Sequence, residues 1–300
     1  MNRPSVRVFR VRLLQQRSHC VASPAMPPRR TLPQELVDKV IDELGNAYRE
    51  PDLVKYSQYR IDAGEALHVC TLVSKNWTGR SRTHLFKEVK IRGDEDGLFL
   101  IPPQSLMPYI KKLKIQLHCK KYRLFPSPDL LAPFHAAPIA CLELTGGVLA
   151  ADARACLVEW IAEISATLQT VIFKSCSLSL SLILDTVLAH PGLKRLHLIC
   201  CDFKPAKLDQ PTIPLQGTQP ADLELGVFSP YWGPDHDLTV AAVAQLPIQF
   251  HRLSFDHIQG RGTTRTTNDL IKANAGSLSS LTVYVCTSWT VKRKEDTTDR

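Results

Sequence analysis

The sequence predicts an α/β protein in which a small helical unit precedes a longer domain built from repeats. The chain has 300 residues, of which 44% are hydrophobic and 22% charged, a composition typical of a globular protein. Amphipathic helical patterns occupy the segment from Thr31 to Phe86. Beyond residue 92 an apolar pattern returns at intervals of 25 to 30 residues. Such a period is typical of supersecondary units that stack on one another.

Residues 1–30 form an arm with seven arginines and no acidic residue. The rest of the chain has 30 basic and 29 acidic side chains, so the arm carries most of the net charge of +8. We therefore expect no nucleic-acid-binding domain. We favour a disordered arm, or a start assigned too early with Met26 as the true beginning; a mitochondrial presequence is the alternative.

The first helix is predicted from a capping box at Thr31 to Gln34, in which Pro33 is tolerated in the first turn. Gly45 and Asn46 are typical of helix ends, so we expect the helix to stop there. Its apolar positions have helical spacing and are Val37, Val40, Ile41 and Leu44.

A second helix is predicted from Glu65, after a polar stretch over residues 47–64. A third segment, Ser81 to Phe86, leads into a strand at Val89 to Ile91. Two or three short helices bury too little apolar surface to be stable on their own, so we expect the unit to dock on a partner. The apolar stripe of the second helix is Ala66, Cys70, Val73 and Trp77.

Residues 31–92 resemble an F-box, in the form found in many proteins of mushroom-forming fungi. The resemblance lies in Leu32 to Leu36 (LPQEL), Ala66 to Trp77 (ALHVCTLVSKNW) and Ser81 to Val89 (SRTHLFKEV). The link from Leu44 to Leu67 is longer than is usual in that family. The resemblance implies docking on the Skp-type subunit of an SCF ubiquitin ligase. We expect the partner-binding residues to be Leu32, Pro33, Leu36, Val40, Leu67, Cys70, Val73 and Trp77.

The repeating pattern has the form apolar-x-x-apolar-x-apolar, with second positions at residues 113, 142, 171, 196, 223, 253 and 281. These spacings lie in the range of leucine-rich repeats or one residue above it. Five residues further on, Cys176, Cys201 and Cys286 stand where such repeats carry Asn or Cys. We expect an irregular leucine-rich-repeat solenoid over residues 93–290, with these cysteines packed inward as small hydrophobes.

The segments between copies also predict helices, which is the alternation that a strand–turn–helix repeat requires. Residues 291–300 are a polar tail, and no recognisable cap follows the last copy. The helical patterns lie at Leu157 to Leu168, Ile183 to Ala189, Asp237 to Leu246 and Asn268 to Asn274.

The chain contains no glycine-rich phosphate loop, no His-Glu-x-x-His, no Cys-x-x-Cys and no nucleophile elbow. Asp235-His236-Asp237 lacks the distant partners that a metal site needs. The nine cysteines are odd in number and irregularly spaced, which favours free thiols in a reducing compartment. No apolar run is long enough to span a bilayer. We therefore expect no enzyme, no catalytic residue, no cofactor and no metal.

A basic cluster runs from Lys111 to Arg123 without an acidic residue. One reading is an anion-facing patch for an acidic partner. We favour the other reading, an edge strand that lysines protect against aggregation. The cluster consists of Lys111, Lys112, Lys114, Lys120, Lys121 and Arg123.

The predicted function is a non-enzymatic adaptor in the cytoplasm or nucleus. Residues 31–92 would bind a Skp-type adaptor of a cullin-based ubiquitin ligase, and residues 93–290 would hold a protein substrate for ubiquitin-dependent degradation. One alternative is a repeat scaffold for protein–protein interaction outside any ligase, with the helical segment as an N-terminal cap. A second is a mitochondrial or nucleic-acid-associated protein led by the arm.

Overall fold

The structure is a computed structural model that describes most of the chain between residues 33 and 284. The described ranges are 33–49, 57–92, 101–117, 128–147, 151–164, 167–203, 220–228, 234–256 and 261–284. The arm, the polar tail, Leu32 and Cys286 lie outside them. Among the helices in these ranges, none combines the length and apolarity needed to cross a membrane.

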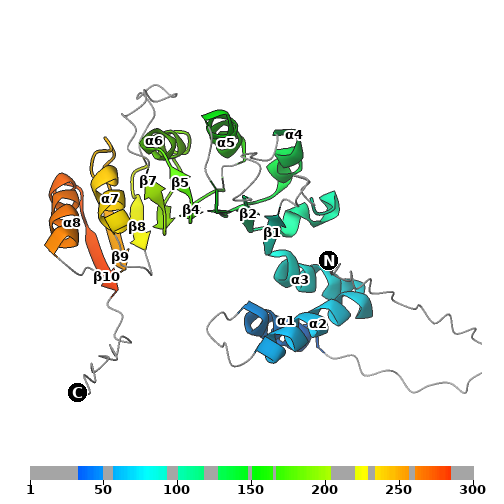
Figure 1. Cartoon of the computed structure of the whole chain (residues 1–300). Coiled ribbons are helices and arrows are strands. Elements are labelled where there is room, and N and C mark those ends of the chain that lie inside the picture. Colours follow the sequence, from blue (N-terminus) through cyan, green and yellow to red (C-terminus); the bar gives the residue numbers. More distant parts are fainter. Residues whose placement is uncertain are drawn as a thin grey trace, which may run out of the picture.

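Three helices form a unit of their own at the start of the described chain (Figure 1). They are α1 (Gln34–Arg49), α2 (Ser57–Val73) and α3 (Lys75–Phe86). Its core consists of Val37 and Ile41 on α1 and Leu67 on α2. The half-buried side chains packed against this core are Leu44, Tyr48, Cys70, Trp77 and Leu85. We call these three helices the helical unit.

The first two helices are longer than the sequence predicts. α1 continues through Gly45 to Arg49, and α2 begins at Ser57 rather than near Glu65. Most of the long link from Leu44 to Leu67 is therefore helical. Leu67 still packs against Val37 and Ile41 on α1, so the length of the link does not prevent the contact between the first two helices. Gly45 does not end α1; it is buried against the imidazole of His84 on α3, where a Cβ would overlap the ring. Tertiary packing, not helix termination, requires this glycine.

The predicted stripe from Ala66 to Trp77 is not on one helix. α2 ends at Val73, and Ser74 has extended backbone with φ −155° and ψ 145°. The Ser74 hydroxyl accepts a hydrogen bond of 3.3 Å from the Asn76 N–H, which caps the start of α3. Trp77 thus belongs to α3 and reaches the core from a different direction than Cys70.

In the described part of the chain, eight parallel strands follow in chain order, so the α/β class is confirmed. The order is β1-β2-β3-β4-β6-β8-β9-β10, and a separate short pair joins β5 (Ser177–Leu178) to β7 (Asp202–Phe203). We call the strands and their helices the sheet unit. The eight strands are β1 (Glu88–Arg92), β2 (Lys112–Gln116), β3 (Cys141–Thr145), β4 (Thr170–Lys174), β6 (Arg195–Ile199), β8 (Glu224–Phe228), β9 (Arg252–Asp256) and β10 (Ser280–Tyr284).

The register corrects one predicted repeat position. Leu196 on β6 pairs with Leu225 on β8, so Leu225 and not Leu223 holds the second apolar position of that copy. The pattern could not distinguish them, because a shift of two residues keeps the same side chains on the same face of a strand. Val89 on β1 pairs with Leu113 and adds a copy before the first one predicted.

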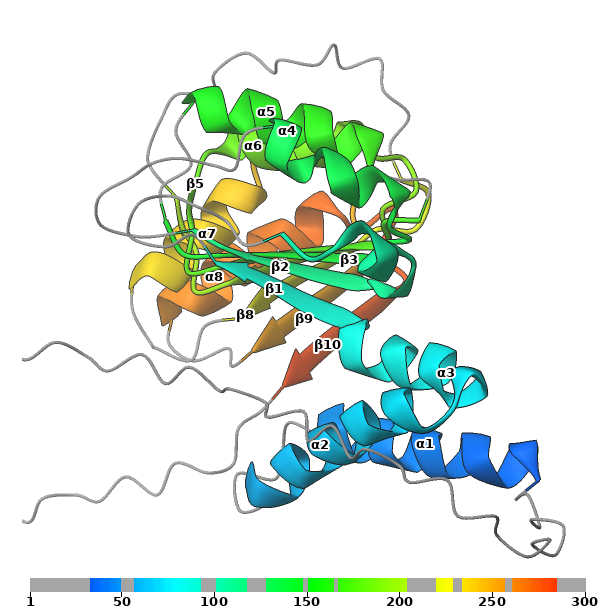
Figure 2. The same ribbon diagram turned by 90° about the vertical axis from the view of Figure 1, so that its right-hand side faces the viewer.

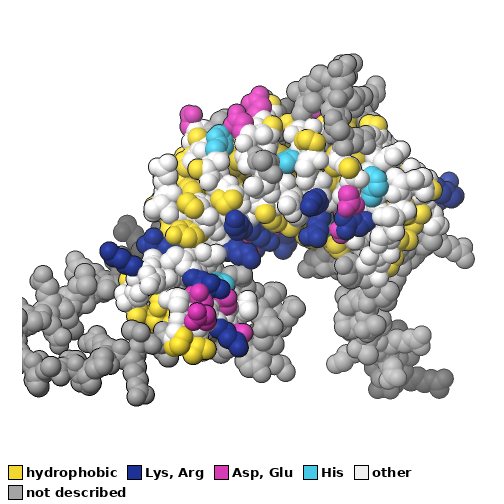
Figure 3. Space-filling view, turned by 180° about the vertical axis from the view of Figure 1, so that it is seen from behind, with side chains coloured by type: hydrophobic (Ala, Val, Ile, Leu, Met, Phe, Trp, Pro, Cys, Tyr) yellow, Lys and Arg dark blue, Asp and Glu magenta, His cyan; other side chains and the backbone are white. Residues whose placement is uncertain are grey.

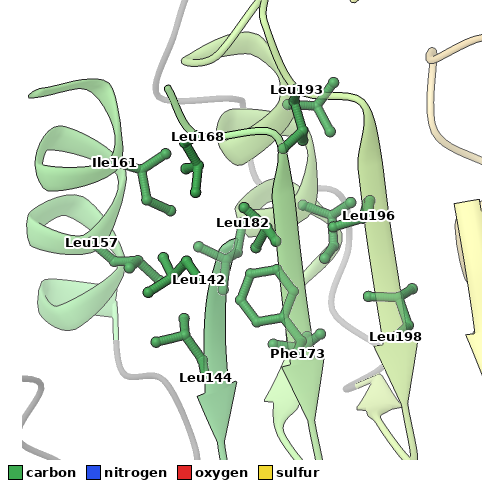
Figure 4. Packing of buried hydrophobic residues seen from close by; sticks show 14 of the residues in the cluster. Leu142, Leu144, Leu157, Ile161, Leu168, Phe173, Leu182, Leu193, Leu196 and Leu198 are labelled. Carbon is green, nitrogen blue, oxygen red and sulfur yellow. The ribbon is translucent and has the colours of Figure 1, made fainter. Parts of the chain in front are cut away.

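All helices that the structure describes in the sheet unit lie on one face of the sheet, which bends into an arc with the helices outside (Figures 1 and 2). Alternate residues of the strands from β2 to β9 point toward these helices and are buried, as Leu142, Phe173 and Leu196 show beside Ile161 and Leu182 (Figure 4). On the last strand, β10, the corresponding Leu281 and Val283 are 45% and 39% exposed. The helices are η2 (Gln104–Tyr109), α4 (Pro128–Leu131), η3 (Ala132–Ala136), α5 (Ala151–Glu163), α6 (Leu180–Leu188), α7 (Pro234–Val243) and α8 (Arg261–Ala273). α5, α6, α7 and α8 all begin earlier than predicted, and α5 ends at Glu163, before the predicted end at Leu168.

The inward placement of Cys176 and Cys201 is confirmed. Each follows a residue of positive φ, 52° at both Ser175 and Cys200, which turns the chain beneath the strand. The Cys176 thiol donates to the Leu144 carbonyl at 3.5 Å and the Cys201 thiol to that of Phe173 at 3.2 Å. Burial raises the pKa of Cys201 to about 11, so this thiol packs and links neighbouring turns.

The contact between Gly45 and His84 gives a prediction whose sign depends on the second residue. Gly45→Ala should destabilise the helical unit by about 1–3 kcal/mol, because the new Cβ displaces the imidazole. In a His84→Ala background the same change should stabilise by about 1 kcal/mol, since alanine favours helix over glycine. Hydrogen exchange of peptides from residues 34–86 would measure both. Equal effects in the two backgrounds would contradict this packing.

Candidate interaction surfaces

Large apolar side chains on α1 and α2 point away from the core of the helical unit. Each is between 52% and 76% exposed, although residues of this type are usually buried. Ile61 and Leu72 are eleven residues apart, which is three helical turns, so they share one face of α2. Hydrophobic patches are visible on the helical unit beside its charged residues (Figure 3). The apolar helix surface consists of Leu36, Val40, Ile61, Val69, Leu72 and Val73.

The structure divides the eight partner-binding residues expected from the sequence. Leu36, Val40 and Val73 lie on the apolar helix surface, and Pro33 is exposed at the start of α1. Leu32 lies outside the described residues. The remaining three, Leu67, Cys70 and Trp77, pack in or against the internal core.

Leu67 is 0% exposed, so its side chain cannot contact a partner. Cys70 is half-buried, and burial raises the pKa of its thiol. The partner-binding residues expected from the sequence did not include Ile61, Val69 and Leu72. The signal that would have found them is the α2 start at Ser57, which places Ala63, Leu67 and Cys70 on one face and the missed residues away from it.

A charged cluster joins α1 to α3 on another side of α1. Arg80 pairs with Asp42 at 2.6 Å and with Asp38 at 3.1 Å, and the His84 Nε2 lies 2.8 Å from an Asp42 oxygen. Hydrogen bonds from Arg80 and His84 hold the pKa of Asp42 well below its usual range. The hydrogen bond with Asp42 likewise raises the pKa of Arg80. The cluster fixes the orientation of α1, and with it that of Leu36 and Val40.

The second candidate surface is the face of the sheet opposite the helices. Within the described ranges no helix lies on this strand face, which is turned toward the side of the helical unit (Figures 1 and 2). Parallel sheets usually have both faces covered, because crossover helices pack on both sides. A face without helices leaves its described outward side chains available to a ligand.

The lysines of β2 are not protecting an edge, so that interpretation of the basic cluster is wrong. β2 lies between β1 and β3. Lys112 pairs with Glu143 on β3 at 3.0 Å, and Lys114 pairs with Glu88 on β1 at 2.6 Å. Lys120, Lys121 and Arg123 lie outside the described residues.

The cross-strand ion pair between Lys112 and Glu143 shifts the pKa of both side chains. Burial alone would raise the pKa of Glu143, but the hydrogen bond from Lys112 and the charges of Lys112, Lys114 and Lys174 lower it. Burial alone would lower the pKa of Lys112, but the hydrogen bond with Glu143 and nearby negative charges raise it. Both groups therefore stay charged near neutral pH. On β1, β2 and β3 the strand face is a network of ion pairs between neighbouring strands.

Further along the strand face the outward side chains become apolar and aromatic. The rings of His197 on β6 and Phe228 on β8 meet edge to face, with centroids 5.4 Å apart and an interplanar angle of 74°. Gly226 lies beneath them: a Cβ there would come within 2.5 Å of Phe228 Cε2 and 2.9 Å of His197 Cδ2. The absence of that Cβ allows the edge-to-face ring pair to approach the backbone of β8 closely.

No group of three or more His, Cys, Asp or Glu side chains in the described ranges could hold a metal ion. The two surfaces instead offer apolar contact on the helical unit and mixed ionic and aromatic contact on the strand face. A scan against protein-family models finds no match to this chain. A search of curated proteins also finds none.

The charged cluster predicts how the helical unit responds to acid. The folded pKa of Asp42 is lower than the unfolded value of 3.8, so its ion pairs stabilise fully above that value and are lost as the pH falls below about 4. Asp42→Asn should therefore lower stability at pH 7 and reduce its further loss on acidification. Hydrogen exchange of α1 peptides between pH 7 and pH 3, corrected for intrinsic exchange rates, would test this. Glu43→Gln, an exposed change outside the cluster, is the control and should leave the acid response as in the wild type.

Proposed function

We propose that this chain is the substrate-recognition adaptor of an SCF-type ubiquitin ligase. The helical unit binds a Skp-type subunit, and the sheet unit, an irregular leucine-rich-repeat array, binds the protein to be ubiquitinated. The observation that carries the proposal is the apolar helix surface. A unit whose own core has three fully packed side chains exposes six large apolar ones on two helices.

The exposed area is large enough to matter energetically. Fully burying a large apolar side chain is worth about 1.5–3 kcal/mol. These side chains are already partly covered, so each has about 1 kcal/mol left to gain. Six of them together are comparable with the lower estimates of the cost of association. A partner therefore has to cover most of the surface, and one truncation alone should weaken binding without abolishing it.

The repeat assignment is supported by regularities in the sheet unit. Its eight strands are parallel, in chain order and in one common register. Cys176 and Cys201 occupy equivalent buried positions after consecutive strands of that sheet and donate to the carbonyls of the preceding repeat. Each unit buries its apolar face only by stacking on its neighbours, as in repeat proteins generally.

The mechanism is proximity. A substrate held by the sheet unit reaches the ubiquitin-loaded enzyme of the same ligase at a raised effective concentration. This chain supplies no catalytic side chain; its contribution is to convert an encounter between two proteins into a reaction within one complex.

The alternative proposal is a repeat scaffold outside any ligase, in which the helical unit caps the array. It is favoured by the junction between the units. Only Lys87 separates α3 from β1, and α3 also contacts η2. A capping role explains this contact but leaves the apolar helix surface uncovered.

Co-purification with a Skp-type subunit and a cullin tests the proposal. Leu36→Asp, Val40→Asp and Leu72→Asp combined should abolish recovery of both subunits, because the charges prevent desolvation of the apolar helix surface. Leu238→Asp is the matched control, since Leu238 is 58% exposed on α7 of the sheet unit; it should leave recovery unchanged. Retained binding by the triple variant would refute the docking assignment. Absence of both subunits from the wild-type preparation would favour the scaffold.

A further inference from the structure

We propose that the strand face binds an extended acidic segment of the substrate that carries one large apolar side chain. Glu and Asp carboxylates of the segment meet Lys and Arg side chains of the strand face, and the apolar side chain packs on an aromatic patch between β4 and β8. The inference rests on the proposed function of the sheet unit as the substrate-binding part. The aromatic patch consists of Ile172, His197, Ile199 and Phe228.

The aromatic patch is continuous across three neighbouring strands. The register pairs Ile172 with His197 and Ile199 with Phe228, and adjacent parallel strands lie about 4.8 Å apart. All four side chains are half-buried on the face without helices. Outward positions of a solvated sheet face normally carry polar residues. Four apolar or aromatic side chains there predict a contact site for one apolar side chain of a partner.

The patch is already arranged before a partner binds. Phe228 lies over Gly226 with its ring against His197, so neither ring has to be ordered on binding. Burial lowers the pKa of His197, with Glu224 opposing the shift, which keeps the imidazole neutral at neutral pH. A preformed neutral surface loses less conformational entropy on binding than exposed flexible side chains would.

Two basic side chains flank the aromatic patch, and the acidic side chain of Glu224 also borders it, 3.9 Å from the Nε2 of His197. By register Lys174 is next to Ile199, and Arg195 is two residues before His197 on the same strand. Arg195 lies 3.5 Å from Glu224, whereas Lys174 is exposed and makes no ion pair within the described ranges. A band of Lys and Arg side chains follows the strand side of the sheet unit (Figure 3).

The charge count along the strand face favours an acidic ligand. Among the side chains that the structure describes, its outward positions carry seven basic groups against three acidic ones. Lys112, Lys114, Arg195 and Arg252 are already paired with acidic side chains. Lys90, Arg92 and Lys174 make no ion pair within the described ranges. The basic groups are spread over several strands and do not converge on one point, which matches a row of single carboxylates better than one phosphate. The basic residues are Lys90, Arg92, Lys112, Lys114, Lys174, Arg195 and Arg252, and the acidic residues are Glu88, Glu143 and Glu224.

The test uses three fluorescein-labelled peptides and the full chain. The first has a central leucine flanked by three Asp or Glu residues on each side, the second replaces the leucine with serine, and the third replaces the acids with lysines. Fluorescence anisotropy should show binding of the first peptide and at least tenfold weaker binding of the other two. Added salt should weaken it further. No binding of the first peptide up to about 1 mM, or equal binding of all three, would overturn the proposal.

Two variants examine the two parts of the site separately. Lys174→Glu combined with Arg195→Glu should weaken the first peptide at least tenfold, whereas Lys272→Glu, an exposed change on α8, should not. Gly226→Ala should weaken it at least fivefold by displacing both rings. The matched control is Gly276→Ala, where a Cβ meets nothing within 4 Å. Unchanged affinity in the first two variants would refute the assigned site.

Two further experiments, competition by an oligonucleotide and co-purification with the Skp-type subunit, distinguish a nucleic-acid surface from a peptide site and this inference from the adaptor function. Displacement of the peptide by single-stranded DNA at an equal or lower concentration would show a nucleic-acid surface and overturn the proposal. Both strand-face variants should still co-purify with the Skp-type subunit, because the apolar helix surface is untouched. Peptide binding without any recovery of that subunit would leave this inference standing and remove the adaptor function.

Discussion

The common register of the eight parallel strands is the constraint on which the rest of the structure depends. Leu113, Leu142, Val171, Leu196, Leu225, Leu253 and Leu281 occupy one row, each paired with the next. Because side chains alternate along a strand, a slip of one residue in any copy would turn its apolar row outward. Fixing this row toward the helices also fixes which residues form the opposite face. The packing of the core therefore determines which residues lie on the strand face, although these residues are not part of the core.

The helical unit depends less on a hydrophobic core and more on a few specific contacts. It has too few buried side chains to define a large core, and specific contacts complete it: the ion pairs of Asp42 with Arg80 and His84, and the seat of His84 against Gly45. These contacts hold α1 and α3 together at the side away from the exposed leucines and valines. The result is a unit that is internally ordered while much of its apolar surface remains uncovered, which is what a docking module requires.

Sequence periodicity predicted the strands well because their apolar rows are long and regular. It was less successful where one residue serves a distant contact. Gly45 has the features of a helix end, and only the position of His84, far along the chain, explains its place within α1. The stripe from Ala66 to Trp77 has helical spacing, but Ser74 caps a new helix, so Leu67, Cys70 and Trp77 belong to the core. Pairing of β2 on both sides was equally outside the reach of local pattern, since an interior strand and an edge strand with lysines look alike in sequence.

The connection between the two units restricts where a bound substrate would lie. α3 leads into β1 through Lys87 alone and contacts η2, so the helical unit is held against the sheet unit by packing and not by a flexible linker. The strand face opens on the same side as the helical unit (Figures 1 and 2). A short stiff connection gives one narrow range of orientations, whereas a flexible linker spreads the bound protein over a large volume and dilutes its effective concentration. If the adaptor proposal holds, the geometry of the α3–β1 junction, more than the affinity of either surface, decides which part of the substrate faces the ligase.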